Sequence, residues 1–145
     1  MDIPTPKTGM VIRYAYLWAD EHAAGRDEGV KDRPVAVVVT VQSGDDQMKV
    51  AVVPVTHTPP KNAESAVEIP ASIKQRIGLD DAPSWIVLDE MNVFQWPGPD
   101  LRPVHTGTAD TPLYGVLPAG FVRTLRDRLT SHIRAHRLRQ IPRSE

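Results

Sequence analysis

The sequence predicts a mainly β (β+α) fold: a small barrel of five or six short strands, with a short inserted helix and a C-terminal helix. Runs rich in Val, Ile and aromatic residues alternate with Pro-, Gly- and Asp-rich turns up to residue 117, which is typical of short strands. Only residues 118–139 carry a long helical periodicity. A chain of 145 residues, 41% of them hydrophobic, suits one core, so residues 1–145 are expected to form a single domain.

The strongest strand signals lie in the first half of the chain. Residues 10–18 are rich in β-branched and aromatic side chains and predict the first strand. Residues 35–41 are almost continuously apolar, so this strand is expected to be central or buried on both faces. A turn at residues 43–46 joins it to a strand at 49–56. Pro59-Pro60 ends that strand, because proline has no N–H to donate to a ladder.

A short helix is expected between the later strands. Ile69, Ile73 and Ile77 recur every four residues, which predicts a short amphipathic helix. Pro70 suits its first turn, and Gly78 suits the position just beyond its end. The other expected segments are strands at 66–69, 84–90 and 92–96, an extended piece ending at 117, a polar arm at 1–8, a long hairpin loop with room for a helical turn at 17–32, and a Pro/Gly/Thr-rich loop at 97–113.

The last expected element is a long helix at residues 118–139. Its apolar residues at spacing four predict a seam that faces the core: Phe121, Leu125, Leu129 and Ile133. Residues 140–145 are expected to be a frayed basic tail.

Charge and composition limit the possible functions. The net charge is −1, but residues 1–120 hold 10 Lys and Arg against 16 Asp and Glu, whereas residues 121–145 hold seven Arg against two acids. A nucleic-acid site would therefore have to be a local patch. Without cysteine there is no disulfide and no thiolate metal site. No apolar run approaches the roughly 18 residues of a membrane span, and no signal peptide is recognisable, so a cytoplasmic protein without membrane contact is expected.

Two polar groups flank the central apolar strands. Arg33 precedes the first of them, and Thr56-His57-Thr58 closes the second. If the two strands are neighbours, these side chains can face one cavity and suit phosphoryl transfer on RNA. A guanidinium matches phosphate bidentately, and imidazole transfers protons near neutral pH. Strand alternation puts Thr56 and Thr58 on one face and His57 on the other. The alternatives are an Arg33 ion pair with Asp32 or Asp89, a structural Thr56 and an exposed strand-end His57.

Five short motifs, spread in order over residues 9–133, resemble the MazF/PemK family of toxin endoribonucleases. They are Gly9 before the first strand, Arg33-Pro34 before an apolar run, Val53-Pro54-Val55-Thr56, Ile86-Val87-Leu88-Asp89-Glu90, and Gly115-Val116-Leu117 before the last helix. The resemblance implies an SH3-like β-barrel that acts as a homodimer. It also implies the toxin of a type II toxin–antitoxin module, which cleaves single-stranded RNA at a short sequence without metal. Its partner would be an antitoxin with an acidic, partly disordered tail.

The resemblance implies Arg33 and Thr56 as the catalytic pair, and His57 is the nearest candidate for acid–base chemistry. Substrate contacts are expected from basic, aromatic and polar groups: Arg13, Tyr14, Lys31, Thr58, Glu90 and Asn92. No cofactor and no metal are expected; His132 and His136 lack the Glu of a zinc protease motif. Loops 17–32 and 97–113 are longer than the family pattern. The alternative function is a catalytically silent barrel that binds RNA or a protein partner.

Overall fold

The computed structural model describes residues 1–25, 31–104, 110–135 and 138–143. Strands dominate these residues, which confirms the mainly β prediction, and three α-helices join them. In chain order the elements are β1 (Met10–Tyr14), α1 (Ala19–Ala23), β2 (Arg33–Gly44), β3 (Gln47–Thr56), a 3-10 turn (Ala63–Ser65), β4 (Ala66–Glu68), α2 (Ala71–Arg76), β5 (Trp85–Val87), β6 (Glu90–Trp96), β7 (Leu113–Val116), α3 (Ala119–Arg134) and β8 (Arg139–Pro142).

Strand β3 is the centre of the sheet. It pairs antiparallel with β2 along most of its length, with β6 through its first half and with β5 at its end. The pairing then continues from β2 to β1 and β7 on one side and from β5 to β4 on the other, while β8 runs parallel to β6. Among the described residues these pairs form a branched sheet that stays open between β4 and β7.

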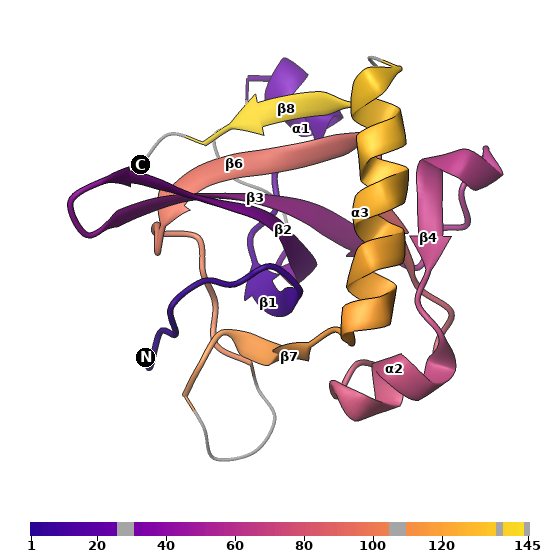
Figure 1. The fold of residues 1–145 in the computed structure, drawn as a ribbon, viewed down its shortest axis with the longest axis horizontal. Helices are drawn as coiled ribbons and strands as arrows, with labels where there is room; N and C mark the ends of the chain where they lie inside the picture. The colour runs from indigo at the N-terminus through magenta and orange to yellow at the C-terminus, as the bar shows by residue number, and fades with distance from the viewer. Residues whose placement is uncertain (26–30, 105–109, 136–137, 144–145) are drawn as a thin grey trace.

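Alternation along β2 and β3 places apolar side chains on both faces of the sheet. Val35 and Val37 face one cluster with Tyr14 and Phe94, whereas Ala36 faces a second cluster with Leu125 and Leu129 of α3. Figure 1 shows α3 running across the sheet from the side of β7 to that of β8. The expected burial of strand 35–41 on both faces is therefore confirmed for its first half.

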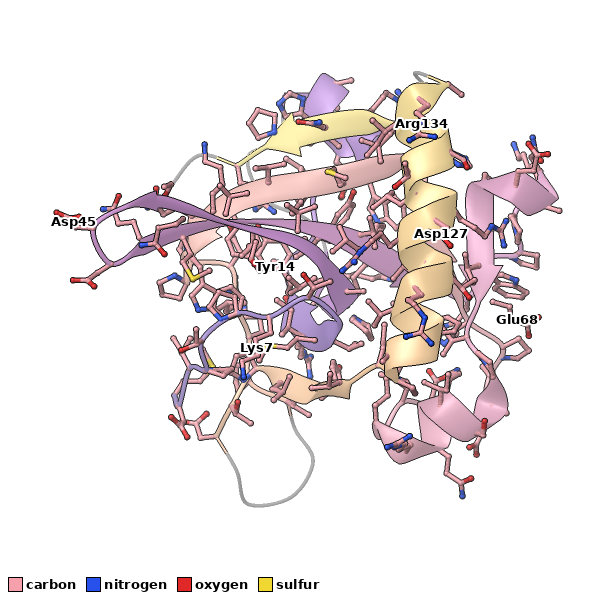
Figure 2. The ribbon with its side chains drawn as sticks, in the orientation of Figure 1. Lys7, Tyr14, Asp45, Glu68, Asp127 and Arg134 are labelled. Carbon is pink, nitrogen blue, oxygen red and sulfur yellow. The ribbon has the colours of Figure 1, made fainter. Side chains whose placement is uncertain are left out.

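The second half of that strand is exposed, and here the prediction was wrong. Val39 and Val41 keep 40% and 53% of their surface accessible. The β2–β3 hairpin extends beyond the core, and Figure 2 shows Asp45 at its outer tip. An apolar run does not reveal where a strand leaves the core.

Helix α3 begins close to the expected position but ends earlier, at Arg134. Leu125 and Leu129 are buried and Phe121 packs against them. The next buried residue is His132, whereas Ile133 is 49% exposed, so placing Ile133 in the seam was wrong. A spacing of four gains about 40° per step on a helix of 3.6 residues per turn, and three such steps carry a side chain off the buried face.

The C-terminal segment is ordered, which corrects the expected frayed tail at 140–145 for its described residues. Strand β8 lies beside β6 with Glu90 opposite Arg139 and Val93 opposite Pro142 (Figure 1). Arg143 follows with its side chain only 1% exposed. Residues 144 and 145 lie outside the described residues.

Both long loops are described in part. The loop at 17–32 contains α1, and residues 26–30 lie outside the described part, as do residues 105–109 of the loop at 97–113.

Gly9 has a φ of 97°. Its N–H donates to Val37 O and its C=O accepts from Leu117 N, so it links the start of β1 to both neighbours. Within the described ranges, no helix combines the length and apolarity needed to cross a membrane.

Candidate active site

The register of the β2–β3 hairpin brings Arg33 and Thr56 together. The β2–β3 pairing reaches Val35 opposite Pro54, and Arg33 and Thr56 each lie two residues beyond that pair at the same end of the hairpin. Both side chains are half-buried at the edge of a pocket of about 330 Å³. This Arg33–Thr56 pocket is lined by Lys31, Asp32, Arg33, Pro34, Val55, Thr56, His57, Thr58, Leu79, Asp80 and Ser84.

Arg33 is held by an aromatic ring rather than by a carboxylate. Its guanidinium carbon lies 4.9 Å from the ring centre of Trp18. Its Nε is buried with no hydrogen-bond partner, and within the described residues its guanidinium makes no ion pair. Burial lowers the pKa of Arg33 from its ordinary value, while the charge of Glu21 opposes that effect. The guanidinium is thus positioned with donors available to an anion.

The alternative ion pair between Arg33 and Asp32 is not formed. Asp32 instead contacts Arg13 and Arg102, with N–O distances of 3.6 Å to each. Asp89, the other alternative partner, also makes no ion pair with Arg33 in the described chain. Within the described chain neither carboxylate pairs with Arg33, so its guanidinium can bind another group.

His57 lies in the same pocket, contrary to the expectation from strand alternation. Strand β3 ends at Thr56, so the alternation of side chains does not extend to residue 57. The Thr58 N–H donates to Thr56 Oγ1 at 3.1 Å, which turns the backbone just after the strand. Thr56 can therefore accept this bond and still donate its hydroxyl hydrogen.

A buried lysine and an aspartate lie behind His57. His57 Nε2 is 2.7 Å from Asp80 Oδ2, and Lys74 Nζ is 2.7 Å from Asp80 Oδ1. Lys74 is 4% exposed and also donates to Ser84 Oγ at 2.7 Å and to the Ala82 carbonyl. Burial raises the pKa of Asp80, but the hydrogen bond from Lys74 and the nearby charges of His57 and Lys74 outweigh it. The pKa of that carboxyl therefore lies below its usual value.

A second pocket also has Arg33 and Thr56 in its wall. It has a volume of about 610 Å³ and shares Arg33, Thr56 and Thr58 with the first pocket. Its remaining wall contains aromatic, proline and charged residues: Trp18, Asp20, Pro59, Pro60, Lys61, Ser65, Ala66, Val87, Asp89 and Glu90. Arg33 thus lines two adjoining pockets.

Two predicted substrate-binding residues are part of the core, which corrects those predictions. Tyr14 is fully buried, with its ring stacked on Phe94 at 4.6 Å between ring centres; Figure 2 shows it inside the molecule. Asn92 is also fully buried, and its side-chain amide is satisfied by Leu17: it accepts from Leu17 N and donates to Leu17 O, both at 2.8 Å. A strand pattern does not separate such a structural amide from one that reads a base.

The other four predicted binding residues lie nearer the pockets. Lys31 and Thr58 are exposed at the first pocket, and Arg13 is linked to its wall through Asp32. Glu90 borders the second pocket but is 8% exposed, and its Oε1 accepts from Tyr16 OH and Ala19 N at 3.1 and 2.9 Å. Burial raises the pKa of Glu90. Through its hydrogen bond from Ala19 N, this carboxyl holds the start of α1.

Sequence reasoning missed Asp80 and Ser84, and with them the hydrogen bonds that Lys74 makes to both. Asp80 lies two residues after Gly78 in a polar turn, and Lys74 directly follows Ile73 in α2, so neither carries a motif. Among the described residues no three His, Asp or Glu side chains gather as metal ligands. Compared with protein-family models, curated proteins and solved structures, the chain has no significant match.

Proposed function

We propose that the protein is an endoribonuclease that cleaves single-stranded RNA at the Arg33–Thr56 pocket. The observation that carries the proposal is the Arg33 guanidinium, half-buried against Trp18, without an acidic partner in the described chain, beside the Thr56 hydroxyl. A desolvated guanidinium costs stability, and a phosphate would offset that cost by taking its donors. Both side chains can donate to the same phosphate.

The proposed reaction uses the 2′-hydroxyl of the substrate as the nucleophile. Attack on the adjacent phosphorus gives a phosphorane with additional negative charge on its oxygens, and cleavage leaves a 2′,3′-cyclic phosphate and a 5′-hydroxyl. Arg33 stabilises that charge, and Thr56 donates one hydrogen bond to a phosphate oxygen. Lys31 and Thr58 hold the neighbouring backbone, and no added metal takes part. His57 is the candidate for proton transfer.

The wider biological proposal rests on the sequence resemblance to the MazF/PemK family. In it the protein is a cytoplasmic toxin of a type II toxin–antitoxin module, and the branched sheet is an SH3-like barrel that works as a homodimer. The antitoxin would place an acidic tail on the Arg33–Thr56 pocket, where carboxylates replace the phosphate charge.

The test is cleavage of single-stranded RNA of mixed sequence by the purified protein in EDTA. Arg33→Ala should lower the rate by about 10²–10³-fold, as loss of a donor to a developing oxyanion does. Thr56→Val keeps the shape of the side chain, and loss of its one charge-assisted hydrogen bond should cost about 10–100-fold. Arg123→Ala removes the same group from an exposed position of α3 and should keep the full rate.

Two results would contradict the proposal. One is a folded Arg33→Ala protein that cleaves as fast as the wild type. The other is wild-type protein that binds RNA by fluorescence anisotropy but cleaves no sequence, which would select the silent RNA-binding barrel instead.

A further inference from the structure

We infer that His57, Asp80 and Lys74 form a proton-transfer chain, in which His57 moves the proton of the substrate 2′-hydroxyl and the other two residues position its ring. The inference rests on the proposed RNA cleavage and adds to it. Arg33 and Thr56 supply charge and a hydrogen bond, but neither is a base near neutral pH. The imidazole at the same pocket supplies one.

Three separate segments converge to build the chain. His57 directly follows β3, Lys74 belongs to α2, and Asp80 lies in the turn between α2 and β5. The two oxygens of the Asp80 carboxylate are divided: Oδ2 lies 2.7 Å from His57 Nε2, and Oδ1 lies 2.7 Å from Lys74 Nζ. A carboxylate bound at both oxygens has a fixed orientation although it is 55% exposed.

Lys74 is the fixed end of the chain. Its ammonium has three donors, and the structure gives them three acceptors: Asp80 Oδ1, Ser84 Oγ and the Ala82 carbonyl. A buried ammonium needs a counter-charge, and Asp80 provides it. If Asp80 only neutralised Lys74, its second oxygen would not need to face an imidazole that lines the pocket.

The geometry assigns the two ring nitrogens different tasks. With Nε2–H donating to Asp80, Nδ1 is the basic nitrogen, and it takes the 2′-hydroxyl proton as the O2′–P bond forms. When the P–O5′ bond breaks, Nδ1 returns that proton to the departing O5′. The ring ends neutral, the products are a 2′,3′-cyclic phosphate and a 5′-hydroxyl, and no further reactant is consumed. Asp80 stays ionised and stabilises the transient imidazolium.

The charged groups that line this pocket with His57 are Lys31, Asp32, Arg33 and Asp80. Of these, Asp80 makes the ion pair with the ring, whereas Asp32 is occupied by Arg13 and Arg102. Arg33 is therefore free to act on the phosphate while Asp80 acts on the base. The two halves of the pocket have separate roles and can be tested separately.

The first experiment measures cleavage of single-stranded RNA between pH 5 and 9. His57→Ala should lower kcat by about 10²–10⁴-fold, flatten the dependence of the rate on pH, and regain at least about tenfold with added imidazole. Asp80→Asn should lower kcat about tenfold or more with little change in KM. Asp81→Asn makes the same change at the next, exposed position and should stay within about twofold of the wild type.

The second experiment determines the tautomer of the His57 ring and does not depend on RNA cleavage. Long-range proton–nitrogen NMR on protein with ¹⁵N-labelled histidine, with His57→Ala used to assign the signal, should show His57 protonated at Nε2 in the neutral ring. Asp80→Asn should mix the two tautomers. If Asp80→Asn alone fails to fold because Lys74 loses its counter-charge, Lys74→Met with Asp80→Asn removes both charges and should fold but remain slow.

The outcomes separate the two proposals. If Arg33→Ala abolishes cleavage while His57→Ala and Asp80→Asn cleave at the wild-type rate, the proton-transfer chain is refuted and the proposed function stands. If wild-type protein cleaves no RNA, both are refuted. An unchanged tautomer in Asp80→Asn also overturns the positioning role of Asp80.

Discussion

Replacing Arg143 tests whether the C-terminal segment helps to hold the fold. The Arg143 guanidinium donates to Asp100 Oδ2 at 2.8 Å, Ala15 O at 2.9 Å and Asn92 Oδ1 at 3.0 Å, and it lies over the Tyr14 ring. Arg143→Met keeps much of the aliphatic stem and removes all of these donors. The Asp100 carboxylate, 8% exposed, then loses its short ion pair.

The expected cost follows from the charge that is left behind. Removing one partner of a buried ion pair costs about 3–5 kcal/mol. Arg102 remains 3.9 Å from the other oxygen of Asp100, so we expect the lower end, about 3 kcal/mol. For a chain of this length that corresponds to a fall in Tm of roughly 10 °C. Asp100→Asn in the same protein should recover part of the loss, because it removes the uncompensated charge.

Urea unfolding followed by circular dichroism, with thermal melts beside it, measures both quantities. Arg139→Met is the matched control, since Arg139 lies in the same C-terminal segment, at the start of β8, but is exposed, and it should change stability by less than about 0.5 kcal/mol. An Arg143→Met protein as stable as the control would show that the tail frays in solution and that the buried network does not contribute.

Three further predictions follow from single contacts. Asn92→Ala leaves the buried N–H and C=O of Leu17 without their partners and should lower the free energy of unfolding in urea by about 2–4 kcal/mol. Asn92→Asp keeps only the acceptor, so its free energy of unfolding should lie between those of the wild type and Asn92→Ala. Glu90→Gln keeps the acceptor oxygen but not the charge. Burial raises the folded-state pKa of Glu90, so ionisation destabilises the folded wild type above the unfolded pKa of about 4.3. The urea midpoints of Glu90→Gln and the wild type should therefore be equal near pH 4. Between pH 4 and pH 7 the midpoint of the variant should rise relative to that of the wild type. Gly9→Ala should lower Tm, because φ is 97° and the added Cβ would lie 3.0 Å from Val122 Cγ2; an unchanged Tm would contradict this.

The strands and the candidate pair of the site could be predicted because they depend on local signals. Arg33 and Thr56 flank two apolar runs joined by a turn, and a hairpin of that kind brings its two ends together. Tyr14 and Asn92 were misplaced for the opposite reason. Alternation shows which residues of a strand share a face. Whether that face is covered from solvent depends on tertiary packing, here of Phe94 against Tyr14, of Leu17 against Asn92 and of β8 beside β6.

The hairpin shows how little of the register is local. The pairing of β2 with β3 shifts between Gln42 and Gly44 and again between Val37 and Val39, and these two irregularities together set Val35 opposite Pro54, two residues before Arg33 and Thr56. With one shift fewer, Val35 would stand opposite Val55, and the side chains beyond it would meet in a different combination. Such shifts arise from packing on both faces, which no single segment encodes.

The sequence by itself determined the β-rich order of the elements, the helix that covers the sheet and the approach of the two hairpin ends that carry Arg33 and Thr56-His57-Thr58, because apolar periodicity and turn residues act over a few neighbours. Tertiary structure alone decided that Lys74 and Asp80 stand behind His57 and that Arg143 is enclosed by Tyr14, Asn92 and Asp100. Those contacts join residues that are distant along the chain or lie in different elements. Their energy comes from removing charges from water in pairs, which happens only once the fold has brought the partners together.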